Sequence, residues 1–418
     1  MYSKLIQEKK MPWGARVFAT QFPVHGFVSF VGSVVGGTCA ATSDEFAKIH
    51  AAMLLEGTKG RTKSDIQLFL DEVGASLSFA ASHDRLIFSG RVREKHLDAV
   101  LALVADILTE PTFPAHELEI LKKREQGTLT FEAQDTHMQA NIALARMLFS
   151  PGHPNYVETT DESRVALEKI TRKDMLAQHK KIIDRSSLIL SIAGDIEPKN
   201  IFALADKRFK HLPQSGFILP SFAPSAPVDA QRVAVPIAHK SSIDYVAGIA
   251  AGITADHADY APLLLGMRIL GNSGGFTGRL MKTVREEEGL TYGVYAYLNG
   301  FSDLTDGFLS VWGTFAPELF EKGRAGIARE IKRIVADGVT AEETKKHREM
   351  YEARSRVQLA NSGALANAAH NVIISGHPIS YLDDFPKKVL KVSAQEVNKV
   401  LKKYLVQEKL SEASAGPV

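Results

Sequence analysis

Residues 44–58 read DEFAKIHAAMLLEGT, and this stretch decides the fold that the sequence predicts. Ser43 precedes it as an N-cap, and Asp44 and Glu45 favour a helix N-terminus because they complement the helix dipole. Gly57 and the threonine after it end the helix. Just upstream, Phe27–Val35 is rich in β-branched and aromatic side chains, which is typical of a buried strand. We therefore expect a strand and then a helix at the start of the fold.

Helices and strands are expected to alternate from this point to residue 193, which indicates an α/β or α+β pattern. One boundary is sharp, because Gly74 stops a short helix. The expected strands are 76–81, 86–92 and 187–193, and the expected helices are 64–73, 94–109, 114–149 (the longest tract) and 172–183.

A proline-rich stretch divides the chain, and the same order of elements returns after it as a pseudo-repeat of about 200 residues. We expect an N-terminal half at 1–212, a linker at 213–229, a C-terminal half at 230–408 and a small polar tail at 409–418. In the second half we expect strands at 245–251, 292–298 and 307–313, and helices at 256–270, 276–287, 317–336 and 341–359.

Composition narrows the class of protein. The 418 residues exceed one typical core, and 45% hydrophobic with 23% charged residues is ordinary for a globular protein. A formal charge of +2 gives no reason to expect nucleic acid as a partner. No run of about 18 apolar residues occurs, so membrane insertion is not expected. A cytoplasmic location is favoured over a periplasmic one, which would require that a secretory signal had been removed.

The sequence resembles the pitrilysin and mitochondrial-processing-peptidase family over roughly residues 14–405. There an inverted zinc motif, His-x-x-Glu-His, stands before a Gly-Thr pair like that at 57–58. Residues 74–84, 270–280 and 284–292 match further family segments in the same order. The resemblance implies an α+β fold with two homologous α/β halves, each a mainly antiparallel sheet packed with helices. It also implies that the chain forms half of a clam-like chamber.

The expected metal ligands are missing from the helix that Gly57 and Thr58 end. Laid on the family motif, Lys48, Ala51 and Ala52 stand in place of His, Glu and His, and none of them can hold Zn²⁺. The family's third ligand, a glutamate, falls by count near residue 128, with Glu125 and Glu132 close by. We therefore expect no metal in this chain and expect zinc in a partner subunit.

Arg285 and Tyr292 match a pair that, in the resembling enzymes, stabilises the oxyanion of the substrate carbonyl. A fixed cation and a phenol hydroxyl can both donate hydrogen bonds to that charge. The alternative is that Arg285 pairs with Glu288 on its own helix while Tyr292 packs.

Further candidate substrate contacts lie in two places. Gly274 and Gly275 lie in a glycine cluster that contacts peptide or only provides a turn. Ser78 and Phe79 lie on the strand to which a peptide adds in active relatives.

Other chemistry is hard to find in the sequence. No Ser/His/Asp or Cys/His set is legible, His153 has no identifiable partner, and Cys39 sits among small residues. The preferred hypothesis is a zinc-free subunit of a heterodimeric metalloendopeptidase that acts on peptides, with a homologous partner carrying the intact motif. Whether to count this subunit as an enzyme is left open, since we do not expect it to hydrolyse peptides alone. The alternatives are an inactive homodimeric peptide-binding or scaffold protein, and an active zinc peptidase with displaced ligands.

Overall fold

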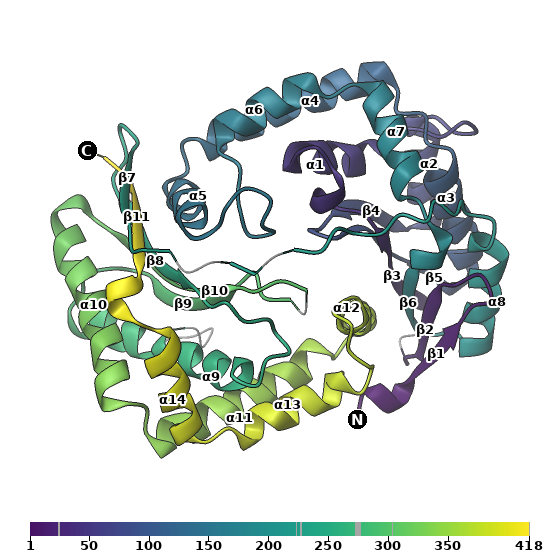
Figure 1. Cartoon of the computed structure of the whole chain (residues 1–418). Coiled ribbons are helices and arrows are strands. Elements are labelled where there is room, and N and C mark those ends of the chain that lie inside the picture. Colours follow the sequence, from purple (N-terminus) through teal and green to yellow (C-terminus); the bar gives the residue numbers. More distant parts are fainter. Residues whose placement is uncertain (24–25, 223, 226–227, 272–276, 303, 418) are drawn as a thin grey trace. The chain divides into compact units, whose positions relative to one another are not determined.

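The computed structural model describes the whole chain except residues 24–25, 223, 226–227, 272–276, 303 and 418 (Figure 1). The chain divides into two compact units, each assembled from three segments. The first unit comprises Met1–Thr128, Asp161–Pro220 and Arg356–Asp384. The second unit comprises Leu129–Thr160, Ser221–Ser355 and Phe385–Val418. Each unit is described by itself below.

Each unit is built around one mainly antiparallel sheet. In the described residues, the first sheet has the order β1-β2-β6-β3-β5-β4 and the second β7-β11-β8-β10-β9. The first-sheet strands are β1 (Ile6–Lys10), β2 (Arg16–Gln21), β3 (Phe27–Val35), β4 (Ser76–Ala81), β5 (Arg85–Arg93) and β6 (Ile189–Gly194). The second-sheet strands are β7 (Arg232–Pro236), β8 (Ile243–Ala250), β9 (Val294–Asn299), β10 (Phe308–Phe315) and β11 (Ser411–Gly416).

The two sheets repeat one topology. Strands β2 and β6 pair in parallel, and β6, β3, β5 and β4 then follow with antiparallel pairing. Strands β7 and β11 are parallel in the same way, and β11, β8, β10 and β9 follow antiparallel. This confirms the expected α+β class with two homologous halves. That the chain forms half of a clam-like chamber stays a prediction.

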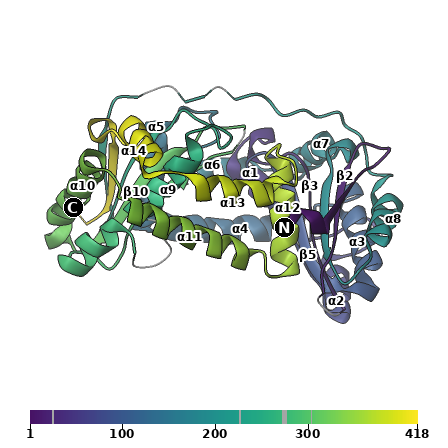
Figure 2. The same cartoon turned by 90° about the horizontal axis from the view of Figure 1, so that it is seen from below.

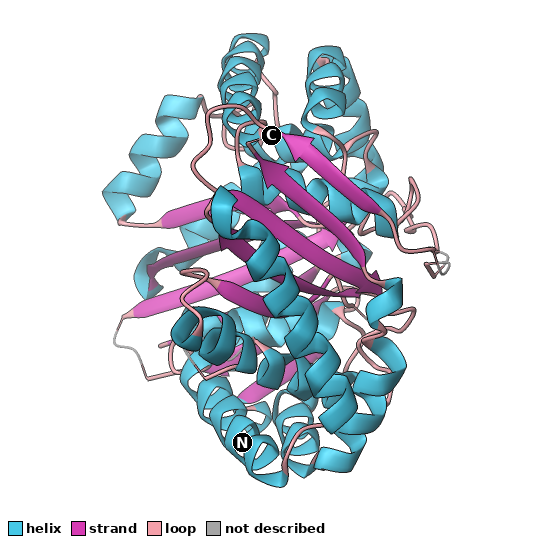
Figure 3. Ribbon diagram, turned by 90° about the vertical axis from the view of Figure 1, so that its left-hand side faces the viewer, coloured by secondary structure: helices cyan, strands magenta, loops and turns pink. Residues whose placement is uncertain are grey.

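Helices surround both sheets, as the colouring by secondary structure makes visible (Figure 3). The earlier helices are α1 (Asp44–Met53), α2 (Lys63–Val73), α3 (Leu97–Thr109), α4 (Ala115–Glu132), α5 (Thr136–Leu148), α6 (Thr160–Lys169), α7 (Arg172–Ile182) and α8 (Pro198–Phe209). The later ones are α9 (Tyr260–Leu270), the π-helix η5 (Met281–Glu287), α10 (Phe320–Asp337), α11 (Ala341–Gln358), α12 (Ser362–Ile374), α13 (Tyr381–Lys391) and α14 (Ala394–Tyr404). Short 3₁₀ turns occur at Ser3–Leu5, Thr38–Ala40, Glu94–His96, Arg185–Ser187, Pro317–Leu319 and Gln407–Lys409.

Each unit contains one helix from the part of the chain that otherwise builds the other unit. Helix α5 precedes the linker, yet it packs on β8 and β11 of the second sheet. Helix α12 comes late in the chain, yet it packs on β3 and β6 of the first sheet (Figure 2). A hydrogen bond of 2.8 Å between Ser33 Oγ and His370 Nε2 fixes α12 on β3. The compact units therefore cut across the expected division into 1–212 and 230–408.

The last residues are not a tail, contrary to the expectation for 409–418. Strand β11 lies inside the second sheet, between β7 and β8. Its side chains are small, and Ala413 and Ala415 are buried against α5, which includes Ala140 and Leu144. Small residues suit this place because they let α5 approach the sheet closely. The same composition made the segment look like a polar terminus.

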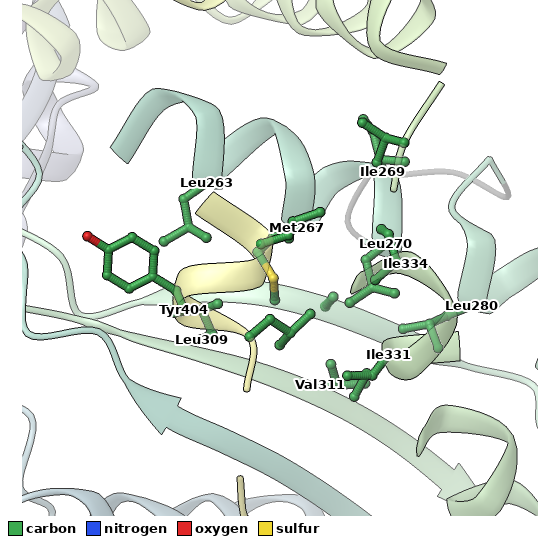
Figure 4. Packing of buried hydrophobic residues seen from close by; sticks show 14 of the residues in the cluster. Leu263, Met267, Ile269, Leu270, Leu280, Leu309, Val311, Ile331, Ile334 and Tyr404 are labelled. Atoms are coloured by element: carbon green, nitrogen blue, oxygen red, sulfur yellow. The ribbon is translucent and has the colours of Figure 1, made fainter. Parts of the chain in front are cut away.

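The largest apolar cluster of the second unit lies on the other face of its sheet. Met267 and Leu270 of α9 point toward Leu309 and Val311 of β10 (Figure 4). Helices α10 and α14 complete the layer, with Ile331, Ile334 and Tyr404. This core positions η5, because Leu280, Met281 and Val284 are buried in it.

Two buried histidines hold α1 against α7. The Nε2 of His179 lies 2.9 Å from the carbonyl oxygen of Leu108, which can only accept, so His179 carries its proton there. Its Nδ1 then accepts from His50 Nε2, 3.3 Å away. Burial lowers the pKa of His50 from 6.5 to about 3, and the nearby His179 adds to this. Burial likewise lowers the pKa of His179 to about 4.

We predict that acid weakens the first unit through this pair. Unfolded histidines bind protons below pH 6.5, whereas His50 and His179 stay neutral in the folded chain until about pH 3 and pH 4, respectively. The contribution of the two histidines to the free energy of unfolding is therefore fully present above pH 6.5. As the pH drops toward 4, the free energy of unfolding should fall by up to about 1.4 kcal/mol per pH unit per histidine. Urea unfolding from pH 8 to pH 4.5 measures this slope. His50→Leu should make it shallower, and the exposed His116→Gln should not; equal slopes in all three chains would refute the prediction.

Candidate functional site

Helix α1 carries the positions where metal ligands were expected. Ser43 caps it as predicted, since its side chain accepts a hydrogen bond from the backbone N–H of Phe46. Strand β4 lies beside the helix in the first unit. Ala51 is buried and Ala52 half-buried, so both methyl groups pack and neither offers a donor atom. Of Lys48, Ala51 and Ala52, only Lys48 has a side chain that can form a hydrogen bond or an ion pair.

The Lys48 ammonium forms an ion pair across to α4. Its Nζ donates to the carboxylate of Glu125, and Glu45 Oε1 lies 3.9 Å away. The Lys48 side chain is 47% exposed, whereas Glu125 is only 7% exposed. Glu125 is one of the two glutamates that the sequence placed near the third ligand position. A fixed positive charge therefore meets this buried carboxylate.

These residues do not fit a zinc ion. Zinc sites in proteins use imidazole, thiolate or carboxylate donors, usually three or four of them. Around Lys48 only Glu45 and Glu125 are of that kind, and both face an ammonium. Across the part of the chain that the structure describes, no group of three or more His, Cys, Asp or Glu side chains is placed to hold a metal.

Strand β4 is the edge of the first sheet and carries Ser78 and Phe79. Among the described residues it pairs only with β5, so its other edge is open to an extended chain. Ser78 is exposed and its Oγ lies 3.0 Å from that of Ser89. The Phe79 ring stands 6.0 Å from that of Phe88 and is half-buried. Edge strands present unpaired N–H and C=O groups, which is the requirement for adding a peptide strand.

Arg285 and Tyr292 lie at the entry to β9 in the second unit. Arg285 is half-buried on η5, and Gly289 then turns the chain with φ 64°. Thr291 fixes the next residues, because its hydroxyl bonds the carbonyl of Thr314 and accepts from the N–H of Gly293. Tyr292 is 92% exposed, so it does not pack as the alternative supposed. The Glu288 carboxylate accepts a hydrogen bond from Arg329.

Gly274 and Gly275 lie outside the described residues. The two ends of their glycine cluster are described and touch each other. A Cβ added to Gly278 would stand 2.8 Å from the Cα of Gly271, and one added to Gly271 would stand 2.8 Å from the amide nitrogen of Ala296. Glycine is therefore required at both ends for packing, which favours the structural role there.

Two clusters appear that the sequence did not reveal. His153 Nε2 lies 3.0 Å from Asp306 Oδ1, and the Ser225 hydroxyl donates to the same carboxylate. Because Ser225 bonds the aspartate and not the histidine, this is no Ser/His/Asp nucleophile; it attaches the linker to the second unit. These three residues are far apart in the sequence, so no motif of fixed spacing could have predicted the cluster.

Cys39 lies 3.2 Å from His83 Nε2, but its S–H donates to the His83 carbonyl oxygen. Burial, with Asp84, raises the pKa of the Cys39 thiol to about 12. The thiol is therefore protonated at neutral pH and is not an activated nucleophile.

Comparison with known proteins gives one family for both halves. The model "Insulinase (Peptidase family M16)" matches residues 42–152, and "Peptidase M16 inactive domain" matches residues 169–351. A non-peptidase homolog, YmxG, of Helicobacter pylori is 22% identical over 85% of this chain and 81% of its own length. A probable mitochondrial-processing peptidase subunit beta of Schizosaccharomyces pombe is 25% identical over 68% of this chain and 64% of its own.

Solved structures show the same fold. The crystal structure of a peptidase M16 inactive domain from Pseudomonas fluorescens superimposes with a TM-score of 0.87 at 23% identity, covering 99% of this chain and 98% of that one. None of the described helices is both long and apolar enough to span a membrane.

We predict that three substitutions on α1 create a zinc site. Lys48→His, Ala51→Glu and Ala52→His together place two imidazoles one turn apart and release Glu125 from the ammonium. Calorimetric titration should then find about one zinc per chain, as three-ligand sites with a bound water do. Adding Glu125→Gln to the triple variant should weaken zinc binding about tenfold or more, since a ligand is lost. A triple variant that ignores zinc, or binds it equally well without Glu125, would contradict the assignment.

Proposed function

Because this chain belongs to peptidase family M16, we propose that it is the zinc-free subunit of a two-chain zinc metalloendopeptidase. A homologous partner with an intact His-x-x-Glu-His motif supplies Zn²⁺, which activates a bound water for attack on a peptide carbonyl. This chain supplies Arg285 and Tyr292 to the partner's site and an edge strand for the substrate. The observation that carries the proposal is the Lys48–Glu125 pair, which replaces the metal on a fold that is otherwise complete.

The chemistry of Arg285 and Tyr292 suits a donated oxyanion site. Charge develops on the carbonyl oxygen during attack, and donors held in place before the reaction stabilise it without reorganising. Tyr292 supports this role because its phenol is 92% exposed while Thr291 and Gly293 on either side are fixed by hydrogen bonds. An exposed tyrosine on a fixed backbone is available to contact a second chain, and tyrosine is enriched at such interfaces.

The relatives support a division of labour between subunits. One is described as a non-peptidase homolog and another as a subunit of a mitochondrial processing peptidase. We infer that this chain likewise acts with a second chain. The substrate class that the edge strand suits is an extended peptide, which includes short or unfolded chains, because backbone pairing tolerates diverse side chains.

A second candidate is a homodimeric peptide-binding or scaffold protein without hydrolysis. The open edge of β4 favours it, since that edge needs no metal to bind a peptide. Ser78 and Phe79 would then line the bound strand, and Gly274 and Gly275 are further proposed contacts. The two candidates differ in what Arg285 and Tyr292 do, because a scaffold has no oxyanion to stabilise.

We predict that Arg285→Ala and Tyr292→Phe lower the turnover of the two-chain enzyme about 10²–10³-fold, since each removes an oxyanion donor. The chain is co-expressed with a relative from the same genome that carries His-x-x-Glu-His, and kcat is measured on a quenched fluorescent peptide. The control is Arg333→Ala, which removes an exposed arginine from α10. Failure of the two chains to associate, or full activity in both variants, would refute the proposal. A homodimer that retains peptide but never cleaves it would favour the second candidate.

Both candidates predict that backbone hydrogen bonds carry peptide binding. A bound peptide methylated at alternate amide nitrogens loses donors toward β4, at about 1 kcal/mol each, or about fivefold in Kd. Fluorescence anisotropy on the parent and methylated peptides measures the difference. Equal affinities would mean that peptide does not add to an edge strand.

A further inference from the structure

The second unit contains a buried guanidinium without an acidic partner. Arg268 lies in the last turn of α9 and is 9% exposed. Its Nε and Nη2 atoms are buried and have no hydrogen-bond acceptor in the described part of the chain, where it also forms no ion pair. Its Cζ lies 5.6 Å from the centre of the Tyr351 ring on α11.

The surroundings of Arg268 add positive charge. Burial lowers its pKa, and the like charge of Arg354 lowers it further. His347 stands one turn before Tyr351 on the same face of α11. It is 2% exposed, and its Nδ1 also lacks a partner among the described residues. Burial, then Arg268 and Lys346, lowers the pKa of His347 to about 4.

The one acid that acts on His347 is already engaged. Glu343 raises the pKa of His347, although only weakly. Its two carboxylate oxygens each accept a hydrogen bond of 2.8 Å from Arg279, and one also accepts from the backbone N–H of Thr340. Glu343 therefore neutralises Arg279 and leaves the charge of Arg268 uncompensated.

Such an arrangement is costly unless a ligand compensates for it. A buried charge without a partner destabilises a fold by several kcal/mol. The ring of Tyr351 compensates for part of this cost through a cation–π contact, but no hydrogen-bond partner of Nε or Nη2 is found among the described residues. Buried unpaired donors of this kind call for an explanation by function or by a bound species.

We propose that Arg268 and His347 form an oxyanion-binding site between α9 and α11. The Nε and Nη2 of a guanidinium present two parallel N–H donors, which match two oxygens of a phosphate or a carboxylate. His347 contributes by taking up a proton at Nδ1, whose N–H then donates a hydrogen bond to the same anion. The ligand is a free inorganic oxyanion or the C-terminal carboxylate of a peptide. The site uses neither Arg285 nor Tyr292, so it stands whether or not the chain serves a peptidase.

The test compares the thermal stability of the full chain in sodium phosphate and in sodium chloride at equal ionic strength. Phosphate should raise the Tm of the unmodified chain in a saturable way. Arg268→Met should remove the phosphate response, Arg268→Lys should weaken phosphate binding at least tenfold, and the exposed Arg333→Met should leave it unchanged. In chloride alone, Arg268→Met should have the higher Tm, because it removes an uncompensated buried charge.

Two further experiments are needed. One identifies the source of the anion, and the other tests the site with a second variant in case the first does not fold. Peptides with a free or an amidated C-terminus are titrated; a preference for the free acid that Arg268→Lys abolishes assigns the site to peptide carboxylates. His347→Gln should weaken binding several-fold and gives a second test if Arg268→Met does not fold. Equal Tm values in phosphate and chloride, together with no preference between the peptides, would overturn the proposal.

Discussion

The ion pair between Lys48 on α1 and Glu125 on α4 is the constraint on which the account of this protein depends. Glu125 is 7% exposed, and a carboxylate so placed needs a compensating positive charge. In hydrolytic relatives, the resemblance implies that a metal ion binds a glutamate ligand near this position. Here the charge is covalently attached to α1, so the contact between α1 and α4 is independent of metal. The fold can therefore persist after the ligands are lost, and with it whatever functions need no metal.

The repeated sheet topology gives each unit one equivalent edge strand. Strand β4 is the edge of the first sheet, and β9, which Tyr292 precedes, is the equivalent edge of the second. Residues at an open sheet edge can meet another chain without disturbing a core. Helix α12 covers the middle strands of the first sheet, and α5 covers those of the second. Neither helix is among the main contacts of β4 or β9 in the described residues. The described fold thus keeps both edge strands although Lys48, Ala51 and Ala52 offer no set of zinc ligands.

Much of this could be predicted from local sequence signals. Strands β3 and β4 begin and end where expected, Ser43 caps α1, and Gly74 stops α2 in the left-handed conformation. The linker stretch is consistent with its composition, because the described part of 213–229 forms no helix or strand beyond an isolated bridge at Gln214. The expected helix at 276–287 is described only as the π-helix at Met281–Glu287. Strand β11 was mistaken for a tail, since its small residues are defined by α5 and not by their own pattern.

What could not be predicted depends on partners far apart in sequence. Helix α12 belongs to the first unit through contacts such as that of His370 with Ser33, which no periodicity indicates. The Lys48–Glu125 pair could be suspected from the count of residues, but its contact needed the packing of α4. The burial of Arg268 and its unpaired nitrogens depend on packing between helices that no pattern in the sequence indicates.

Diffraction at the zinc absorption edge, from crystals of the unmodified chain soaked in zinc, tests the central claim most directly. The account predicts no anomalous peak beside α1, with the Lys48 ammonium within hydrogen-bonding distance of Glu125. A strong peak coordinated by Glu125 and other donors at that place, with Lys48 turned away, would contradict it.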